Sequence, residues 1–180
     1  PIDAYPHEYY ECSVSNHDKL DEVLKDIISK YNVDLYHSNA GRCMPDNHEF
    51  NIAHWQSQID LNLLPHVVAV RNFLPVWLQK NKGHMLITSS SAALTTMPGS
   101  ATYAVTKSAT LAYAEWLAMT YTTKGIGTTV LCPSGVRTRM KDDTDFSHRT
   151  HDMVGPFLEP KDVAVTTLDA IQDGKFRIVT

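Results

Sequence analysis

The sequence predicts an α/β fold built on a parallel sheet, and three observations favour that class. Segments patterned as strands alternate with segments patterned as helices along the chain, an order typical of parallel strands joined by helices. The 180 residues suit a single domain. Hydrophobic residues make up 43% of the chain and charged residues 20%, which is the balance of a globular domain with a buried core.

Composition also excludes several functional classes. The formal net charge of −4 argues against a surface that binds nucleic acid, because such surfaces are usually basic. The apolar runs are short and broken, so we expect no membrane span, and we see no basic-then-apolar secretion signal. Three widely spaced cysteines, Cys12, Cys43 and Cys132, fit a reducing compartment better than a disulfide scaffold. We therefore expect a cytoplasmic protein.

The first expected elements are a strand, a helix and a second strand. Glu8 to Val14 is compatible with a short strand, and Ser15 is a suitable N-cap for the helix that follows it. Apolar residues then recur on one face of that helix. They are Leu20, Val23, Leu24, Ile27, Ile28 and Tyr31. Val33 to Tyr36 has the pattern of the second strand, which ends near Ser38-Asn39-Ala40-Gly41.

A polar loop, a long helix and a buried strand are expected next. Residues 42–53 are polar, and Trp55 to Lys80 has the pattern of a helix. Pro65 and Pro75 fall inside this helix, where each removes a backbone donor and should bend it. Met85 to Thr88 then predicts a buried strand, which ends in a run of serines. Residues 92–100 are expected to form a loop.

The remaining elements continue the alternation. Ala101 to Tyr121 contains no Gly or Pro and predicts a helix, and Thr128 to Cys132 predicts a strand. Residues 137–158 are polar and irregular. Pro160 suits the first position of a final helix that stops at Gly174. A last strand follows at Phe176 to Val179.

Two patterns look like ligand sites and are better explained otherwise. Lys124-Gly125-Ile126-Gly127 precedes a strand, whereas a phosphate-binding loop follows a strand and opens a helix, so we expect a turn. Histidines and aspartates gather in the irregular segment, at His148, His151, Asp142, Asp143 and Asp145. A solvated loop explains them better than a metal site does, because no cysteine is close. We therefore expect no metal.

Tyr103 and Lys107 are the first residues that suggest chemistry. They are four positions apart on the predicted helix, so their side chains project from one face. A neighbouring ammonium favours the phenolate, so we expect Lys107 to lower the pKa of Tyr103. Such a pair can protonate or deprotonate an alcohol oxygen. By itself, however, the pair is more often an ordinary surface contact.

The motifs around Tyr103 and Lys107 favour a catalytic pair over a surface contact. Ser90 lies 13 residues before Tyr103, and Asn62 lies 28 residues before Ser90. Asn39-Ala40-Gly41 ends an earlier strand, and Pro133-Ser134-Gly135-Val136-Arg137-Thr138 follows a later one. In order and spacing these motifs resemble those of the short-chain dehydrogenase/reductase family. The family patterns are Asn-Asn-Ala-Gly, a single Asn, Ser, Tyr-x-x-x-Lys and Pro-Gly-x-Val-x-Thr. The resemblance covers nearly the whole chain and implies a doubly wound, Rossmann-like three-layer sheet.

The resemblance also implies an activity and a set of catalytic residues. The chain would be an NAD(P)-dependent oxidoreductase that interconverts a carbonyl and a secondary alcohol, with a slight preference for NADP over NAD. Tyr103 would be the general acid and base, and Lys107 would lower its pKa and hold the nicotinamide ribose. Ser90 would polarise the substrate carbonyl together with Tyr103. Asn62 would support a water relay to Lys107.

The resemblance also implies which further residues contact the cofactor. Asn39, Ala40 and Gly41 would lie beside the adenosine, and Val136 and Thr138 would contact the nicotinamide carboxamide. The remaining implied cofactor residues are Ser13, Val14 and Pro133. The chain departs from the family at two of its motifs: Ser13-Val14 stands where Asp-Val is usual, and Ser134 stands where the family has glycine.

The family also implies partners and a missing segment. Helices equivalent to residues 55–80 and 101–121 pair between subunits, so we expect a homodimer or homotetramer acting on a small molecule. A loop at about residues 139–158 would shape the substrate pocket. The glycine-rich βαβ segment of the family is not seen in the sequence. We therefore expect residues 1–180 to be a single domain that is incomplete at its N-terminus, with a gap where the first strands would pair.

Two alternatives remain open from the sequence. One is a non-catalytic member of the family that binds a nucleotide and senses redox state. The other is an oligomer-forming fragment with no cofactor site.

Overall fold

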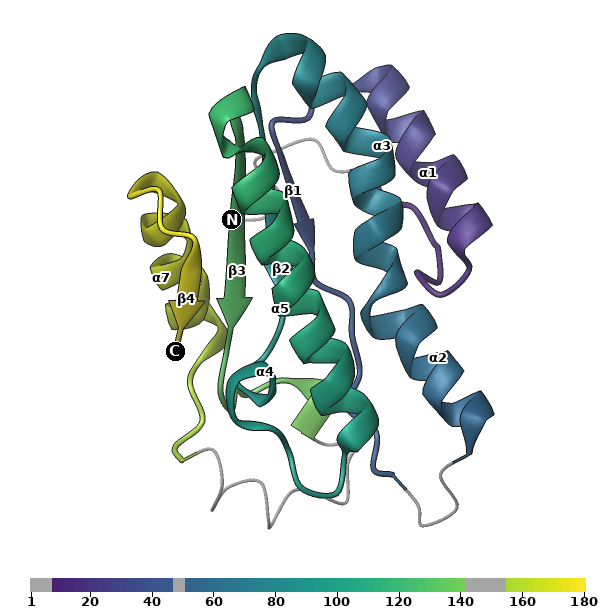
Figure 1. Cartoon of the computed structure of the whole chain (residues 1–180), viewed down its shortest axis with the longest axis vertical. Coiled ribbons are helices and arrows are strands. Elements are labelled where there is room, and N and C mark those ends of the chain that lie inside the picture. Colours follow the sequence, from purple (N-terminus) through teal and green to yellow (C-terminus); the bar gives the residue numbers. More distant parts are fainter. Residues whose placement is uncertain (1–7, 47–50, 142–154) are drawn as a thin grey trace.

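One parallel sheet forms the centre of the molecule. Figure 1 shows the computed structural model, which describes residues 8–46, 51–141 and 155–180. The strands are β1 (Leu35–Ser38), β2 (Gly83–Thr88), β3 (Ile126–Cys132) and β4 (Arg177–Val179). They form a four-stranded sheet in the order β1-β2-β3-β4, and each pair is parallel. This arrangement confirms the predicted α/β class.

Helices cover both faces of this sheet (Figure 1). They are α1 (His17–Lys30), α2 (Ile52–Asn62), α3 (Leu64–Lys80), α4 (Ala92–Thr95), α5 (Ala101–Tyr121) and α7 (Pro160–Gln172). Successive side chains of a strand point to opposite faces. Met85 and Ile87 of β2 therefore join the larger core with α1, α3 and α5, while Leu86 joins a smaller core with α7. The result is a three-layer fold.

The N-terminal segment differs from its prediction in two ways. Residues 8–14 form no strand. A strand needs a partner for its backbone groups, and the only ladder of β1 in the described part of the chain is with β2. The N-cap of α1 is Asn16, whose Oδ1 accepts a hydrogen bond from the Lys19 amide at 3.1 Å. The predicted cap, Ser15, instead lies 2.9 Å from the Ser13 hydroxyl.

The long helix predicted from Trp55 to Lys80 is two helices. It breaks at Leu63, between the end of α2 and the start of α3. Pro65 occupies the first turn of α3, where its missing donor is tolerated. Pro75 lies inside α3 without ending it. The break is important because it places Asn62 at the last position of α2.

The sequence led us to expect no membrane span, but this stretch passes a test of length and composition for one. Residues 52–80, taken together, are long and apolar enough to cross a bilayer by length and composition. Half of the apolar window is buried inside the protein, however, which is also typical of a core helix in a soluble protein. The cytoplasmic location remains a prediction, and the three cysteines are free thiols in the structure.

Most other boundaries shift by a few residues. β2 and β3 begin earlier than predicted, at Gly83 and Ile126, whereas β1 begins later, at Leu35. The predicted loop 92–100 contains the short helix α4. Helix α5 matches its prediction, and Gly125 adopts the left-handed conformation that ends the turn before β3. The predicted strand gap does not fall among the four described strands, which pair consecutively.

A histidine of α3 is buried where this helix packs against β1. His66 is fully buried, and its Nδ1 lies 2.6 Å from the Oγ of Ser38. Its Nε2 is buried without a hydrogen-bond partner among the described residues. Burial, followed by the nearby charge of Lys107, lowers the pKa of His66 from 6.5 to about 3. The ring is therefore neutral in the folded protein at ordinary pH.

Replacing His66 with glutamine should flatten the pH dependence of the free energy of unfolding. The unfolded chain takes up a proton at His66 below pH 6.5, whereas the folded chain resists it down to about 3. The stability present above 6.5 is therefore lost as the pH falls through this window. Between about pH 7.5 and pH 4.5 the wild type should lose roughly 2–3 kcal/mol more than His66→Gln. Urea denaturation at both pH values measures this, and equal losses would contradict it.

Candidate active site

A cavity lies at the carboxyl ends of the strands. Its volume is about 800 Å³, within the usual range for small-molecule sites, and this edge of a parallel sheet is where α/β folds bind ligands. Segments that follow three neighbouring strands contribute to its wall together with α5. The predicted site residues among its lining are Asn39, Ala40, Gly41, Ser90, Tyr103, Lys107, Pro133, Val136 and Thr138.

Helix α5 presents the predicted acid–base pair to this cavity. Tyr103 and Lys107 are both buried and lie on the same face, one turn apart. The Nζ of Lys107 is 5.8 Å from the centroid of the Tyr103 ring. The spacing of four residues therefore brings the two side chains together, as the sequence predicts.

The pKa of Tyr103 moves in the opposite direction from the prediction. Burial raises it from 10.0 to about 12, and a hydrogen bond with Ser90 offsets part of this rise. The positive charge of Lys107 is not among the causes of the shift. Desolvation dominates because the phenol lies in the protein interior. Tyr103 is therefore a neutral phenol at physiological pH, which is the form that donates a proton.

Lys107 is a cation enclosed by protein. Burial lowers its pKa from 10.5 to about 8. Its Nζ donates to the carbonyl oxygen of Thr88 at 2.9 Å. An ammonium carries three donors, and this is the one hydrogen bond that Nζ makes within the described part of the chain. The Nζ atom itself lies next to Gly41, where an added Cβ would be 3.1 Å away.

The structure distinguishes the three serines that follow β2. The Oγ of Ser90 accepts a hydrogen bond from the amide of Ala92 at 3.1 Å, and its side chain also interacts with Tyr103, whose pKa it lowers. The Ser89 hydroxyl instead donates to the carbonyl oxygen of Lys107 at 2.8 Å and so ties β2 to α5. Ser91 lines the cavity as well. Ser90 is thus the serine in contact with the tyrosine.

Asn62 lies behind the cavity wall rather than in it. Its side chain is fully buried; its Oδ1 accepts from the Arg42 amide at 2.9 Å, and its Nδ2 donates to the Arg42 carbonyl at 3.0 Å. The Thr110 hydroxyl donates to the Asn62 main-chain carbonyl at 3.1 Å. Asn62 therefore fastens the segment after Gly41 to the break between α2 and α3. A water relay through it remains a prediction.

Thr88 is a residue that the sequence reasoning missed. Its carbonyl holds Lys107, and its hydroxyl donates to the Oδ1 of Asn39 at 2.9 Å. The ring of His37 lies 2.8 Å from the same hydroxyl. Both Thr88 and His37 line the cavity. Its position in the sequence could have indicated this role, because Thr88 ends a predicted strand and lies two residues before Ser90.

Two predicted cofactor residues are not brought to the cavity. Ser13 is exposed and bonds Ser15, and Val14 packs against the larger core. Neither is among the residues that line the cavity. The segment after β3 does reach it, and Val136 forms an isolated parallel bridge with Leu158. Most of the loop expected to shape the substrate pocket, at residues 142–154, lies outside the described residues.

Two other segments of the sequence have patterns that resemble ligand sites. His148, His151 and the three aspartates near them also lie outside the described residues. In the part of the chain that the structure describes, no group of three His, Cys, Asp or Glu side chains could hold a metal ion. Lys124 and Gly125 lie in the turn before β3, as expected, and Ile126 and Gly127 are the first residues of β3.

Comparison with known proteins assigns the family. The sequence profile described as short chain dehydrogenase matches residues 4–147. The chain belongs to the short-chain dehydrogenase family. Among curated relatives, an uncharacterized oxidoreductase of Staphylococcus epidermidis is 25% identical over 146 residues, which cover 80% of this chain and 64% of that protein. Epidermal retinol dehydrogenase 2 of Mus musculus is 31% identical over 119 residues, which cover 64% of this chain and 38% of that protein.

Solved structures agree on the fold of this family member. A Beutenbergia cavernae protein assigned as an NAD(P)-dependent gluconate 5-dehydrogenase, crystallised with NADP, superposes with a TM-score of 0.86 at 19% identity. The match covers 99% of this chain and 76% of that one. The chain spans less than two thirds of the length of the two curated relatives. The part of it that the structure describes has the fold of the solved structure.

Enlarging Gly41 should weaken nucleotide binding in a graded way. A Cβ there would lie 3.1 Å from both the Oδ1 of Asn62 and the Nζ of Lys107, so Gly41→Ala must push these groups aside and Gly41→Val must fill the space beside them. We expect the Kd for NADPH or NADH to rise several-fold for alanine and about tenfold or more for valine. Titration of cofactor fluorescence measures this, and an unchanged Kd in the valine variant would contradict it.

Proposed function

We propose that this family member is an NAD(P)-dependent oxidoreductase that interconverts a carbonyl and a secondary alcohol. The observation that carries the proposal is the convergence of Ser90, Tyr103 and Lys107 on one cavity at the carboxyl ends of the strands. Ser90 interacts with Tyr103 and lowers its pKa, and the Lys107 ammonium lies beside the same ring. A phenol, a hydroxyl and a cation in this arrangement suit proton transfer to and from a substrate oxygen.

The residues present fit a nicotinamide cofactor. The Nζ of Lys107 has further hydrogen-bond donors and lies beside Gly41, where the lack of a side chain leaves room. These donors would hold the hydroxyls of a ribose. Asn39, Ala40 and Gly41 would lie along the adenosine side, and Pro133, Val136 and Thr138 would lie along the nicotinamide. When bound, such a cofactor supplies or accepts the hydride. The choice between NAD and NADP stays open.

Tyr103 would serve as the acid in reduction. As the carbonyl carbon gains a hydride, the carbon–oxygen double bond becomes a single bond and negative charge collects on oxygen. The neutral phenol of Tyr103, whose pKa is about 12, gives its proton to that oxygen. The Ser90 hydroxyl donates a hydrogen bond to the same oxygen and stabilises its charge. The Lys107 ammonium lies beside the ring that then carries the negative charge, 5.8 Å from its centroid. Oxidation of the alcohol runs through the reverse transfers.

Replacing Tyr103 with phenylalanine should abolish turnover while leaving cofactor binding in place. Loss of a general acid typically lowers the rate by about 100- to 10 000-fold. The measurement is NADH and NADPH binding by fluorescence, followed by turnover of a panel of small ketones. Tyr113→Phe is the matched control, because Tyr113 lies on the same helix but not in the cavity lining. Binding without turnover in the wild type would support a redox sensor, and no binding would support a fragment without a site.

We also propose a homodimer or homotetramer, with α5 in the interface. Several apolar side chains of α5 face solvent: Val105 and Trp116 are 51% exposed and Met119 is 87% exposed. Such a row favours a protein partner. Ala104 and Ala114, on the other side of the helix, are buried within the chain.

Introducing a charge at Trp116 should therefore shift the protein to a smaller species. Trp116→Lys places an ammonium in the proposed interface, where its desolvation opposes association. Light scattering during size-exclusion chromatography measures the change. A wild type that is already monomeric at working concentration would overturn the proposed oligomer.

A further inference from the structure

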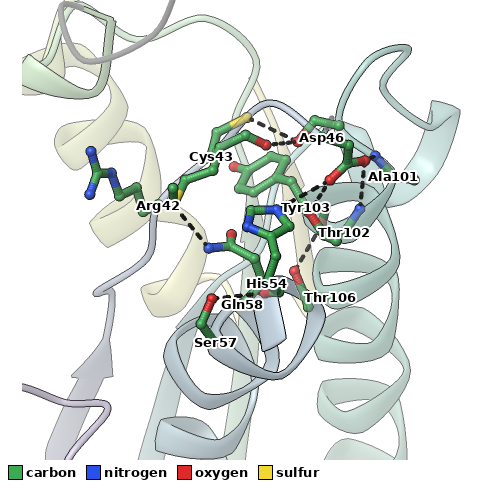
Figure 2. A network of polar contacts seen from close by, with 12 residues as sticks. Arg42, Cys43, Asp46, His54, Ser57, Gln58, Ala101, Thr102, Tyr103 and Thr106 are labelled. Atoms are coloured by element: carbon green, nitrogen blue, oxygen red, sulfur yellow. Dashed lines mark hydrogen bonds and ion pairs between the residues drawn. The ribbon is translucent and has the colours of Figure 1, made fainter. Parts of the chain in front are cut away.

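Helix α5 takes its N-terminal cap from another part of the chain. Its own N-cap residue, Ser100, makes no side-chain capping bond; its hydroxyl donates instead to the Met44 carbonyl at 2.6 Å. The carboxylate of Asp46 takes over this role. Its Oδ2 accepts from the amide of Ala101 and, at 3.2 Å, from the amide of Thr102 (Figure 2). An anion at this end of a helix also complements the helix dipole.

The other oxygen of the same carboxylate joins two further side chains. The Thr102 hydroxyl donates to Oδ1 at 2.7 Å, and the Nε2 of His54 lies 3.4 Å from it. Both the Asp46 and His54 side chains are mostly buried, so water competes little for these contacts. Figure 2 shows these groups gathered beside the Tyr103 ring. One carboxylate therefore links α5 to α2.

Residues 42–46, which we call the strap, carry Asp46 from the end of α2 to the start of α5. At its start, Arg42 is held by Asn62 through both backbone groups. In its middle, Met44 is held by Ser100 and lies 3.3 Å from the Gln58 amide nitrogen. At its end, the Asp46 amide donates to the Gly99 carbonyl at 3.0 Å. The strap is thus fastened along its length to α2 and to the start of α5.

Tyr103 is in the part of α5 that depends most on this cap. Ser100 is the N-cap, so Ala101, Thr102 and Tyr103 form the first turn. The amides of a first turn have no partner within the helix, and this turn frays when its cap is lost. Fraying at Ala101 and Thr102 would move the phenol relative to Ser90, while Lys107, one turn later, would remain in place.

We propose that Asp46 is a positioning residue that holds Tyr103 in register with Ser90 by capping α5 from the strap. The expected effect on kcat rests on the proposed function. The expected effect on the first turn of α5 rests on the capping geometry alone. The carboxylate acts through hydrogen bonds to the first turn and does not touch the substrate. A residue that can still accept those bonds should therefore replace it, and one that cannot should misplace the phenol.

The test compares Asp46→Ala with Asp46→Asn in the full-length protein. Alanine accepts no hydrogen bond, so the first turn of α5 should fray and kcat for ketone reduction should fall by up to about tenfold, the factor by which cap loss typically shifts a helix-end equilibrium. KM and the Kd for NADPH should stay within about twofold, because a displaced acid affects the transition state rather than ground-state binding. Asparagine is as good a cap as aspartate, so Asp46→Asn should recover most of kcat. Asp18→Ala, in the exposed first turn of α1, is the control.

Amide hydrogen exchange gives a readout that does not require activity. Exchange at residues 101–103 should speed up about tenfold in Asp46→Ala and stay near wild type in Asp46→Asn. Should Asp46→Ala fail to fold, Thr102→Val removes the 2.7 Å bond to the same carboxylate with little change of shape. That variant should show a smaller fall in kcat and faster exchange at the same amides.

Each outcome decides between the two proposals. An unchanged kcat in Asp46→Ala, or an asparagine variant as impaired as the alanine one, would overturn the positioning role. A raised KM with unchanged kcat would overturn it too. A wild type with no turnover would defeat the proposed function alone, and the exchange rates at residues 101–103 would then decide the capping role.

Discussion

The burial of one cation, the ammonium of Lys107, is the constraint on which the rest of the site depends. A buried charge is costly unless protein groups compensate for it, and its pKa is lowered to about 8 for that reason. The carbonyl of Thr88 supplies the compensation at the end of β2, and Ser89 fastens the backbone of Lys107 to the same strand end. The sheet edge and α5 are thereby held together, and Tyr103 is brought beside Ser90.

Around this pair, the chain uses irregular backbone to bring distant segments together. At the break after Asn62, the main-chain carbonyl of Asn62 accepts from the Thr110 hydroxyl, and its side-chain amide binds both backbone groups of Arg42. The strap that begins there reaches the start of α5 and ends in the Asp46 cap. Gly41 lets Asn62 and Lys107 approach the same turn from two sides. The site therefore rests on regular elements joined by a few specific hydrogen bonds.

Much of this architecture could be predicted because its causes are local. The alternation of strands and helices, the uninterrupted helix from Ala101 to Tyr121 and the spacing of Tyr103 and Lys107 follow from residue patterns a few positions long. The strand predicted at Glu8 to Val14 is wrong because a strand depends on a partner that no local pattern reveals. The helix break at Leu63 differs from the predicted bend for a similar reason: His17, from α1, binds the Asp60 carbonyl near the break at 2.9 Å.

The sequence by itself determined the class of fold, the residues of the proposed proton-transfer group and their order along the chain, since spacing on a helix decides which side chains share a face. Only the tertiary structure decided how those residues behave. It placed Ser90 rather than Ser89 against Tyr103, raised the pKa of that tyrosine where a lowering was expected, and kept Ser13 away from the cavity. It also supplied the cap of α5 from Asp46. Burial and contacts between distant segments set these properties, and neither is encoded in any short stretch of sequence.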